Sequence, residues 1–200
     1  MNTVTKRVGL MVVGLGMAAA AQAGQGDLVT RVRATYLSYD NGQNSLPVTV
    51  KAKDLWIPEV DFSYYLTDNV SAELVLTYPQ KVDITVNGSD AGSVTALPPT
   101  LLAQYHFGAS DGAFVPYVGA GLNLTLFGSR SVLAGGAHIS KSSVGVAAQV
   151  GADFALSGAW SMNVDLKYIG MTTDVYVGST KAGKLDLNPW VASIGIGYRF

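Results

Sequence analysis

The segment WIPEVDFSYYL at residues 56–66 alternates between two kinds of side chain along its whole length. The even-numbered positions carry Trp, Pro, Val, Phe, Tyr and Leu, whereas Glu59, Asp61 and Ser63 lie between them. A β-strand places successive side chains on opposite faces, so a period of two gives each face its own character. The segment therefore predicts a strand with one apolar face and one polar face.

The same alternation recurs through most of the chain and predicts eight strands. Their ranges are 27–38, 54–66, 70–78, 95–107, 114–127, 142–156, 160–172 and 184–200. The connections at 67–69, 108–113 and 157–159 are short, whereas those at 39–53, 79–94, 128–141 and 173–183 are long and rich in Gly, Ser, Asn and Lys. Short turns at one end and long loops at the other are typical of outer-membrane barrels. We therefore predict an all-β fold, an eight-stranded antiparallel up-and-down transmembrane β-barrel with both termini on the periplasmic side.

The last predicted strand indicates which face meets lipid. One of its faces carries Trp190, Ala192, Ile194, Ile196, Tyr198 and Phe200, and the other carries Val191, small residues and Arg199. A soluble barrel of the lipocalin type points its apolar face inward, whereas a membrane barrel has an apolar outer band with aromatic residues near the strand ends. The aromatic ends favour the membrane barrel, and the final Phe200 resembles the C-terminal signal of bacterial outer-membrane proteins.

The composition excludes several classes of protein. Only 14% of the 200 residues are charged, against about 25% in average soluble proteins. The chain has no Cys, which excludes disulfides, thiol nucleophiles and Cys-ligated metals. Its two His residues are far apart in the sequence and make a poor metal site. We predict no metal site and no cofactor.

One short motif could indicate catalysis. His138-Ile139-Ser140 would place a His and a Ser on the same face of an extended segment. A deacylase needs such a pair together with an acidic residue that orients the His. The motif has no acid nearby in the sequence and falls in a predicted loop, so we predict that the protein is not an enzyme and has no catalytic residues.

The N-terminus has the features of an export signal. Lys6 and Arg7 precede an apolar stretch of 13 residues, 8–20, and Ala21-Gln22-Ala23 follows with the small-x-small pattern of a cleavage site. We predict that residues 1–23 are a cleaved signal peptide and that residues 24–200 form the barrel domain; the alternative is a retained helical anchor. The 177 residues that remain carry 11 basic and 14 acidic side chains, a balance that does not indicate nucleic-acid binding. We expect a location in the outer membrane of a Gram-negative bacterium.

Polar residues of inward parity gather in the lower and middle barrel. Besides Gln104, His106 and Gln149, they include nine charged residues: Arg31, Arg33, Glu59, Asp61, Glu73, Asp153, Asp165, Lys167 and Arg199. Buried charges must be paired and hydrogen-bonded, because desolvation otherwise destabilises the fold. We predict that these residues form a network that fills the lower lumen.

Near the outer end the inward positions become apolar. They include Leu37, Leu55, Ile57, Val75, Leu102, Phe127, Ile169, Met171, Leu185 and Leu187. We predict a hydrophobic ligand pocket formed by Leu55, Ile57, Leu102, Phe127, Leu185 and Leu187. The alternative is that these side chains only pack against folded-over loops.

Four prolines lie near the outer ends of adjacent strands. They are Pro58, Pro79, Pro98 and Pro99. Proline has no N–H to contribute to a β-ladder, so it is tolerated where strand pairing is already broken. The prolines predict a lateral opening from the lumen to the lipid, although they could equally do no more than delimit the long loops.

Several motifs together resemble the OmpW family of small outer-membrane proteins, which includes alkane-uptake proteins. They are Pro58-Glu59-Val60-Asp61 with Tyr64-Tyr65-Leu66-Thr67-Asp68-Asn69, Leu97-Pro98-Pro99-Thr100 with Gln104-Tyr105-His106-Phe107, Pro116-Tyr117-Val118-Gly119-Ala120-Gly121-Leu122-Asn123, Lys167-Tyr168, Leu187-Asn188-Pro189-Trp190 and Gly195-Ile196-Gly197-Tyr198-Arg199-Phe200. The similarity covers essentially all of the chain after residue 23. It implies an eight-stranded barrel with a hydrophobic channel, closed toward the periplasm, that passes small apolar molecules sideways into the membrane.

The functional prediction combines these observations. We expect an outer-membrane channel for passive uptake of small hydrophobic molecules, with lateral release into the membrane. The alternative is a plugged structural, adhesion or receptor barrel without transport activity. The expected partners are small hydrophobic solutes and the lipid or lipopolysaccharide of the outer membrane, and we expect a monomer.

Overall fold

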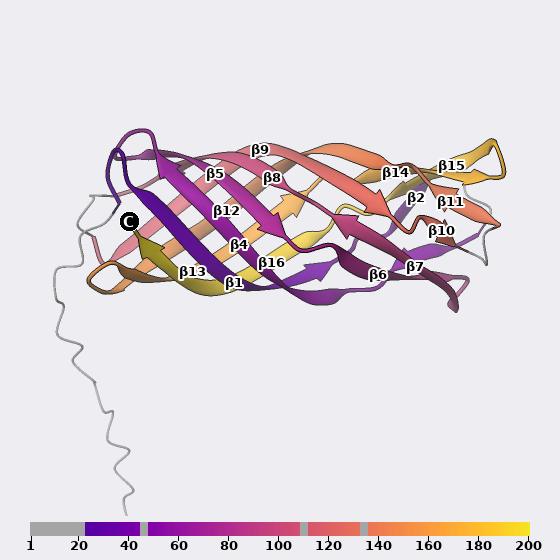
Figure 1. Cartoon of the computed structure of the whole chain (residues 1–200), viewed down its shortest axis with the longest axis horizontal. Helices are drawn as coiled ribbons and strands as arrows, with labels where there is room; N and C mark the ends of the chain where they lie inside the picture. Colours follow the sequence, from indigo (N-terminus) through magenta and orange to yellow (C-terminus); the bar gives the residue numbers. More distant parts are fainter. Residues whose placement is uncertain (1–22, 45–47, 109–111, 133–135) are drawn as a thin grey trace, which may run out of the picture.

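The computed structural model describes residues 23–44, 48–108, 112–132 and 136–200 (Figure 1). Eight strands form the barrel: β1 (Leu28–Ser38), β4 (Leu55–Tyr65), β5 (Val70–Thr77), β8 (Thr100–His106), β9 (Phe114–Gly128), β12 (Ser142–Ser157), β13 (Trp160–Ile169) and β16 (Trp190–Arg199). Eight further strands of the described residues extend it: β2 (Gly42–Asn44), β3 (Val50–Ala52), β6 (Gln80–Val86), β7 (Ser89–Leu97), β10 (Ser131–Val132), β11 (Ala137–Ile139), β14 (Thr172–Val177) and β15 (Thr180–Asp186).

The eight barrel strands close into one antiparallel barrel. Each pairs with the barrel strands next to it in chain order, and β9 pairs with β12. The first and last strands complete the circle, from Val29 opposite Arg199 to Ser38 opposite Trp190. The predicted fold is therefore confirmed. The described part of the chain contains no helix that is long and apolar enough to cross a membrane.

The prediction was wrong about the long connections. Residues 39–53, 79–94, 128–141 and 173–183 were expected to be loops, but most of their described residues belong to strands that continue the wall beyond the barrel. Figure 1 shows this extension, with β6, β7, β10, β11, β14 and β15, at the end opposite the C-terminus. Two predicted strands are also interrupted, 95–107 at Pro98-Pro99 and 184–200 at 187–189. Proline removes a ladder donor, which accounts for a break at these places.

The outer surface of the barrel has the chemistry of a membrane-facing surface. Its exposed middle is aliphatic, with Val32, Leu122 and Val146 59, 61 and 67% exposed. Aromatic pairs flank this band, Tyr36–Trp56 and Tyr168–Trp190 toward the extension and Trp160–Tyr198 toward the C-terminus. Apolar bands between aromatic girdles are the membrane-facing pattern of these barrels. The apolar face therefore points outward, as the sequence predicts.

Candidate functional site

Arg31 crosses the lower lumen and pairs with two carboxylates. Its side chain is completely buried, and its Nη1 donates to Asp61 Oδ1 at 3.0 Å. Its Nε and Nη2 donate to Asp153 Oδ1 and Oδ2 at 3.0 and 2.7 Å. A bidentate contact of this kind fixes both the position and the orientation of the guanidinium.

Arg33 and Lys167 extend the network upward. Arg33 Nη2 donates to Glu73 Oε1 at 2.7 Å and lies 2.6 Å from Asp61 Oδ2. Its Nη1 lies 3.5 Å from Glu59 Oε1 and 3.4 Å from Asp165 Oδ1. Lys167 Nζ donates to Asp165 Oδ1 at 2.5 Å. We call the three cations and the five carboxylates, including Asp153, the plug.

Strand register and missing side chains explain this gathering. Arg31 stands opposite Asp61, and Arg33 opposite Glu59, in the β1–β4 ladder. On the other side of β1 the paired residues are Gly197 and Gly195. A Cβ at Gly195 would lie 2.8 Å from Arg33 Cγ, so any larger residue would displace this arginine.

Neutral side chains complete the hydrogen bonds of the plug. The buried hydroxyl of Tyr117 donates to Asp165 Oδ2 at 2.9 Å. Asn163 Nδ2 donates to Asp153 Oδ1 at 2.9 Å, and Gln149 Nε2 donates to Glu73 Oε2 at 2.8 Å. Tyr117 and Asn163 were not among the predicted members of the network, although the period of two gives both of them inward parity.

His106 closes the lower lumen as part of an aromatic stack. Its ring lies between Tyr65 and Tyr117, with centroids 4.8 and 5.3 Å away. Its Nε2 lies 3.0 Å from Ser71 Oγ. The ring therefore packs against two aromatic rings and lies within hydrogen-bond distance of a serine, as expected of a structural histidine.

The placement predicted for Arg199 was wrong. It lies at the periplasmic rim, where its Nη1 is 3.4 Å from Asp27 Oδ2, and a quarter of its side chain is exposed. Arg199 is the last residue of β16. A side chain on the inward face at the end of a strand lies at the mouth of the barrel and not in its interior. The other eight predicted charges form the plug, which therefore holds three cations and five carboxylates.

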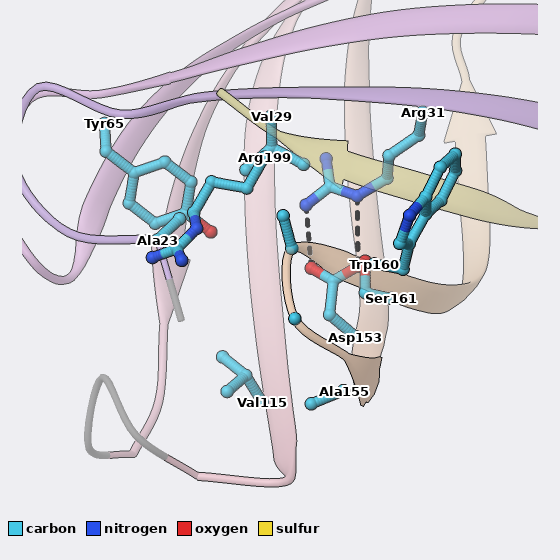
Figure 2. Close-up of a pocket in the computed structure, with 12 residues that line it drawn as sticks. Ala23, Val29, Arg31, Tyr65, Val115, Asp153, Ala155, Trp160, Ser161 and Arg199 are labelled. Carbon is cyan, nitrogen blue, oxygen red and sulfur yellow. Dashed lines mark hydrogen bonds and ion pairs between the residues drawn. The ribbon is translucent and has the colours of Figure 1, made fainter. Parts of the chain in front are cut away.

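A cavity of about 50 Å³ opens at this periplasmic mouth. Tyr65, Trp160 and Arg199 line it, and the Arg31–Asp153 pair lies at its inner end (Figure 2). The ion pair and the aromatic stack thus separate the periplasmic mouth from the rest of the lumen.

Above the plug the interior is mainly apolar, although Gln80, Thr100, Asn123 and Thr125 are also buried. The buried apolar side chains there form one cluster, which we call the chamber: Leu37, Tyr39, Ala52, Ile57, Val75, Val82, Ile84, Ala91, Val94, Ala96, Leu102, Phe127, Ala137, Ile139, Ala147, Ile169, Met171, Val175, Leu185, Leu187 and Val191. Five of the six predicted pocket residues belong to it, and Leu55 packs against it. Several members come from β6, β7, β11 and β14, which the sequence analysis expected to be loops.

The outer part of the chamber contains a cavity of about 110 Å³ with no exposed polar surface. Leu185 and Leu187 line this cavity together with Ile84, Val94 and Val175. Leu55, Ile57, Leu102 and Phe127 are not among its lining residues. The predicted pocket is thus split, because the cavity lies within the extension and four of the six residues belong to the barrel proper.

Backbone pairing in the wall stops between two segments that each contain one of the predicted prolines. The β4–β5 pairing ends outward at Glu59 opposite Thr77. The next backbone contact beyond it joins Lys53 N to Asp83 O at 2.9 Å. Among the described residues, no backbone pairing joins 54–58 to 78–82, and these segments contain Pro58 and Pro79. We call this gap the window.

Pro98 and Pro99 extend the window on its other side. The β5–β8 pairing ends at Val75 opposite Thr100, and the β6–β7 pairing begins at Gln80 opposite Ala96. On their far side the two prolines remain tied to β9, since Leu124 N donates to Pro99 O at 3.0 Å. The break therefore faces β5 alone.

A sequence model of the OmpW family matches residues 22–200. The chain belongs to the OmpW family. An uncharacterised outer-membrane protein, y4mB of Sinorhizobium fredii, is 40% identical over 173 residues, with 82% of this chain and 75% of that protein covered. The Dibenzothiophene metabolism operon protein PahQ of Pseudomonas aeruginosa is 28% identical over 174 residues, with 81% and 80% covered. The crystal structure of the outer membrane protein OprG from Pseudomonas aeruginosa superimposes with a TM-score of 0.80 at 25% identity, covering 90% of this chain and 99% of that chain.

These similarities assign this OmpW-family barrel to the outer membrane. Two of the matched proteins, y4mB and OprG, are named as outer-membrane proteins, which agrees with the aliphatic band and its aromatic girdles. The predicted signal peptide, residues 1–23, lies almost entirely outside the described residues.

His138, from the short motif that could indicate catalysis, lies on β11. Its ring stacks on the ring of Tyr176, with centroids 5.3 Å apart.

Proposed function

We propose that this OmpW-family barrel takes up small apolar molecules from outside and releases them sideways into the outer membrane. The observation that carries the proposal is the order of three features along one lumen. An apolar chamber lies on the outer side, a charged plug closes the inner side, and the window opens at their boundary.

The chamber supports the choice of solute. A cavity without polar surface favours apolar molecules, which gain roughly 25 cal/mol for each Å² that leaves water. A water-filled pore for ions or sugars needs polar groups along its wall, whereas no side chain of the chamber carries a charge. The name of one relative, PahQ, refers to dibenzothiophene metabolism, and dibenzothiophene is an aromatic and largely apolar compound.

The plug supports the direction of release. A solute that continued toward the periplasm would have to break ion pairs among fully buried groups such as Arg31 and Asp61, and a low-dielectric network of this kind is costly to disrupt. The lipid beyond the window is an apolar phase like the chamber. A sideways route therefore avoids the only strongly polar barrier in the described lumen.

Uptake measurements test the proposal. Cells that lack other members of the family would express the wild-type chain, and the accumulation of radiolabelled n-octane would be followed over time. We expect faster accumulation than in cells with the empty vector, and no steady ion current in planar bilayers that contain the purified protein. Equal accumulation in both kinds of cell would contradict transport and favour the alternative of a plugged structural or receptor barrel.

A further inference from the structure

A third, smaller cavity lies where the plug meets the chamber. Its volume is about 20 Å³. Glu59 and Lys167 line it from the plug, Ile57 and Val75 from the chamber, and Thr77 and Pro98 from the edge of the window. A charged wall, an apolar wall and the lateral opening therefore meet around one small space.

One polar atom at this cavity has no hydrogen-bond partner. Glu59 is 97% buried, and its Oε1 accepts no hydrogen bond from any described residue. Arg33 Nη1 and Lys167 Nζ lie 3.5 and 3.7 Å from it, beyond the distance of a good hydrogen bond. Leaving a buried acceptor unpaired destabilises the fold, so a donor inside the cavity would be favoured.

Two deeper carboxylates of the plug, Asp153 and Glu73, are better satisfied. Asp61 Oδ2 also accepts no hydrogen bond from a described residue, but Asp61 does not line the cavity. Asp153 accepts two hydrogen bonds from Arg31, and Glu73 accepts one each from Arg33 and Gln149. Glu59 differs from both because it also borders an open space. The unpaired Oε1 therefore belongs to a plug carboxylate that lines a cavity, where a bound group could reach it.

Size and surroundings limit what can fill the space. A cavity of about 20 Å³ holds one water-sized group, since a water needs roughly 10–15 Å³ by this measure. A hydroxyl fits, because it donates one hydrogen bond and accepts others. Most of the remaining wall is apolar, so the atom that carries the hydroxyl should belong to an apolar body.

We propose that this cavity is a subsite for the hydroxyl group of a small aliphatic alcohol. The hydroxyl donates to Glu59 Oε1 and accepts from Lys167 Nζ, and the carbon chain passes Thr77 and Pro98 toward the window. The inference rests on the proposed function and narrows its substrate class to apolar molecules with one hydroxyl end.

Methyl NMR of the protein in lipid nanodiscs tests the subsite. The methyl groups of Ile57 and Val75 would report titrations with 1-hexanol and with n-hexane for the wild type and for Glu59→Gln. Because charge-assisted hydrogen bonds are about twice as strong as neutral ones, we expect Glu59→Gln to weaken 1-hexanol binding about fivefold and n-hexane binding less than twofold. Glu59→Met, which removes the acceptor, should abolish the preference for the alcohol. Partition of each probe into lipid is common to all variants and cancels in the comparison.

Glu73→Gln is the matched control, because Glu73 is a buried plug carboxylate that does not line the cavity. We expect it to bind 1-hexanol like the wild type. If both probes bind and Glu59→Gln changes neither affinity, the cavity holds only water and the subsite is refuted. Equal weakening by Glu59→Gln and Glu73→Gln would also refute it, because the cause would be the charge of the whole plug. If neither probe shifts the methyl signals, the proposed function itself fails.

Discussion

Arg31 and Asp153 are 122 residues apart in the chain, yet they form a bidentate ion pair across the lumen, with N–O distances of 3.0 and 2.7 Å. This pair separates the periplasmic mouth from the interior (Figure 2). It joins β1 to β12, which are not neighbours in the barrel wall. The contact therefore stabilises the closed lumen from within as well as blocking it.

Replacing Arg31 by Met should lower the free energy of unfolding by about 3–5 kcal/mol, because Asp153 loses its bidentate partner and Asp61 keeps only Arg33. The matched control is Arg199→Met, whose partly exposed pair with Asp27 should contribute about 0–1 kcal/mol. Denaturant unfolding in detergent micelles, followed by tryptophan fluorescence, measures both. Similar losses in the two variants would mean that the plug is hydrated and open.

The plug should tolerate the loss of an acid better than the loss of a base. It holds five carboxylates and three cations. One of these cations, Arg33, lies within 4.0 Å of four carboxylates, those of Glu59, Asp61, Glu73 and Asp165. We expect Glu59→Gln to change the free energy of unfolding by less than about 1 kcal/mol, since the negative charge is in excess. Arg33→Met should cost about 3–5 kcal/mol. Equal losses of unfolding free energy in Glu59→Gln and Arg33→Met would show that the excess negative charge of the plug is already neutralised.

The period of two made the barrel and much of the plug predictable. Parity alone assigns Arg31, Asp61 and Lys167 to the inward face, and any charge on that face must find a partner. Parity does not show whether an inward position lies deep in the lumen or at its mouth. For this reason Arg199 was placed in the network although it lies at the rim.

The extension was missed for a different physical reason. Lys81-Val82-Asp83-Ile84 does alternate, with Val82 and Ile84 buried and the two charged residues exposed. Its outer face is polar because it meets water, so it lacks the apolar outer band by which the other strands were recognised. The prediction accepted a segment as a strand only where one face was apolar enough to meet lipid. A search for any alternation of apolar and polar residues would have predicted β6 and the chamber wall that it forms.

The mature chain should begin at Gly24. Its backbone N lies 2.9 Å from Asp27 Oδ2, and a Cβ at this position would lie 3.2 Å from Asp68 Oδ1. Cleavage after Ala23 would turn this nitrogen into an ammonium beside two carboxylates. Intact-mass spectrometry of the protein from purified outer membranes checks the cleavage site. A mass that includes residues 1–23 would instead show a retained anchor.

Restoring hydrogen-bond donors at the window should slow lateral release. Pro58→Val and Pro79→Val together return two N–H groups to segments that face each other without pairing, so the gap can close. We expect a lower rate of n-octane uptake, with n-hexane still shifting the methyl signals of the chamber. Pro116→Val is the control, because Pro116 lies on β9 opposite Ala152, away from the window. A lower rate in the control as well would point to general damage to the barrel.

A charge inside the chamber should abolish uptake while the barrel still folds. Val94 is buried and lines the apolar cavity, whereas its neighbour Thr95 is on the opposite face of β7. In Val94→Asp the carboxylate either draws water into the cavity or remains unpaired, and both outcomes remove the gain of roughly 25 cal/mol per Å² that attracts an apolar solute. Thr95→Asp adds the same charge outside the chamber and should transport like the wild type. Heat-modifiable migration on gels confirms folding, and n-octane uptake gives the rate. If Val94→Asp takes up n-octane normally, the solute does not pass through this cavity, and the route must lie nearer the window.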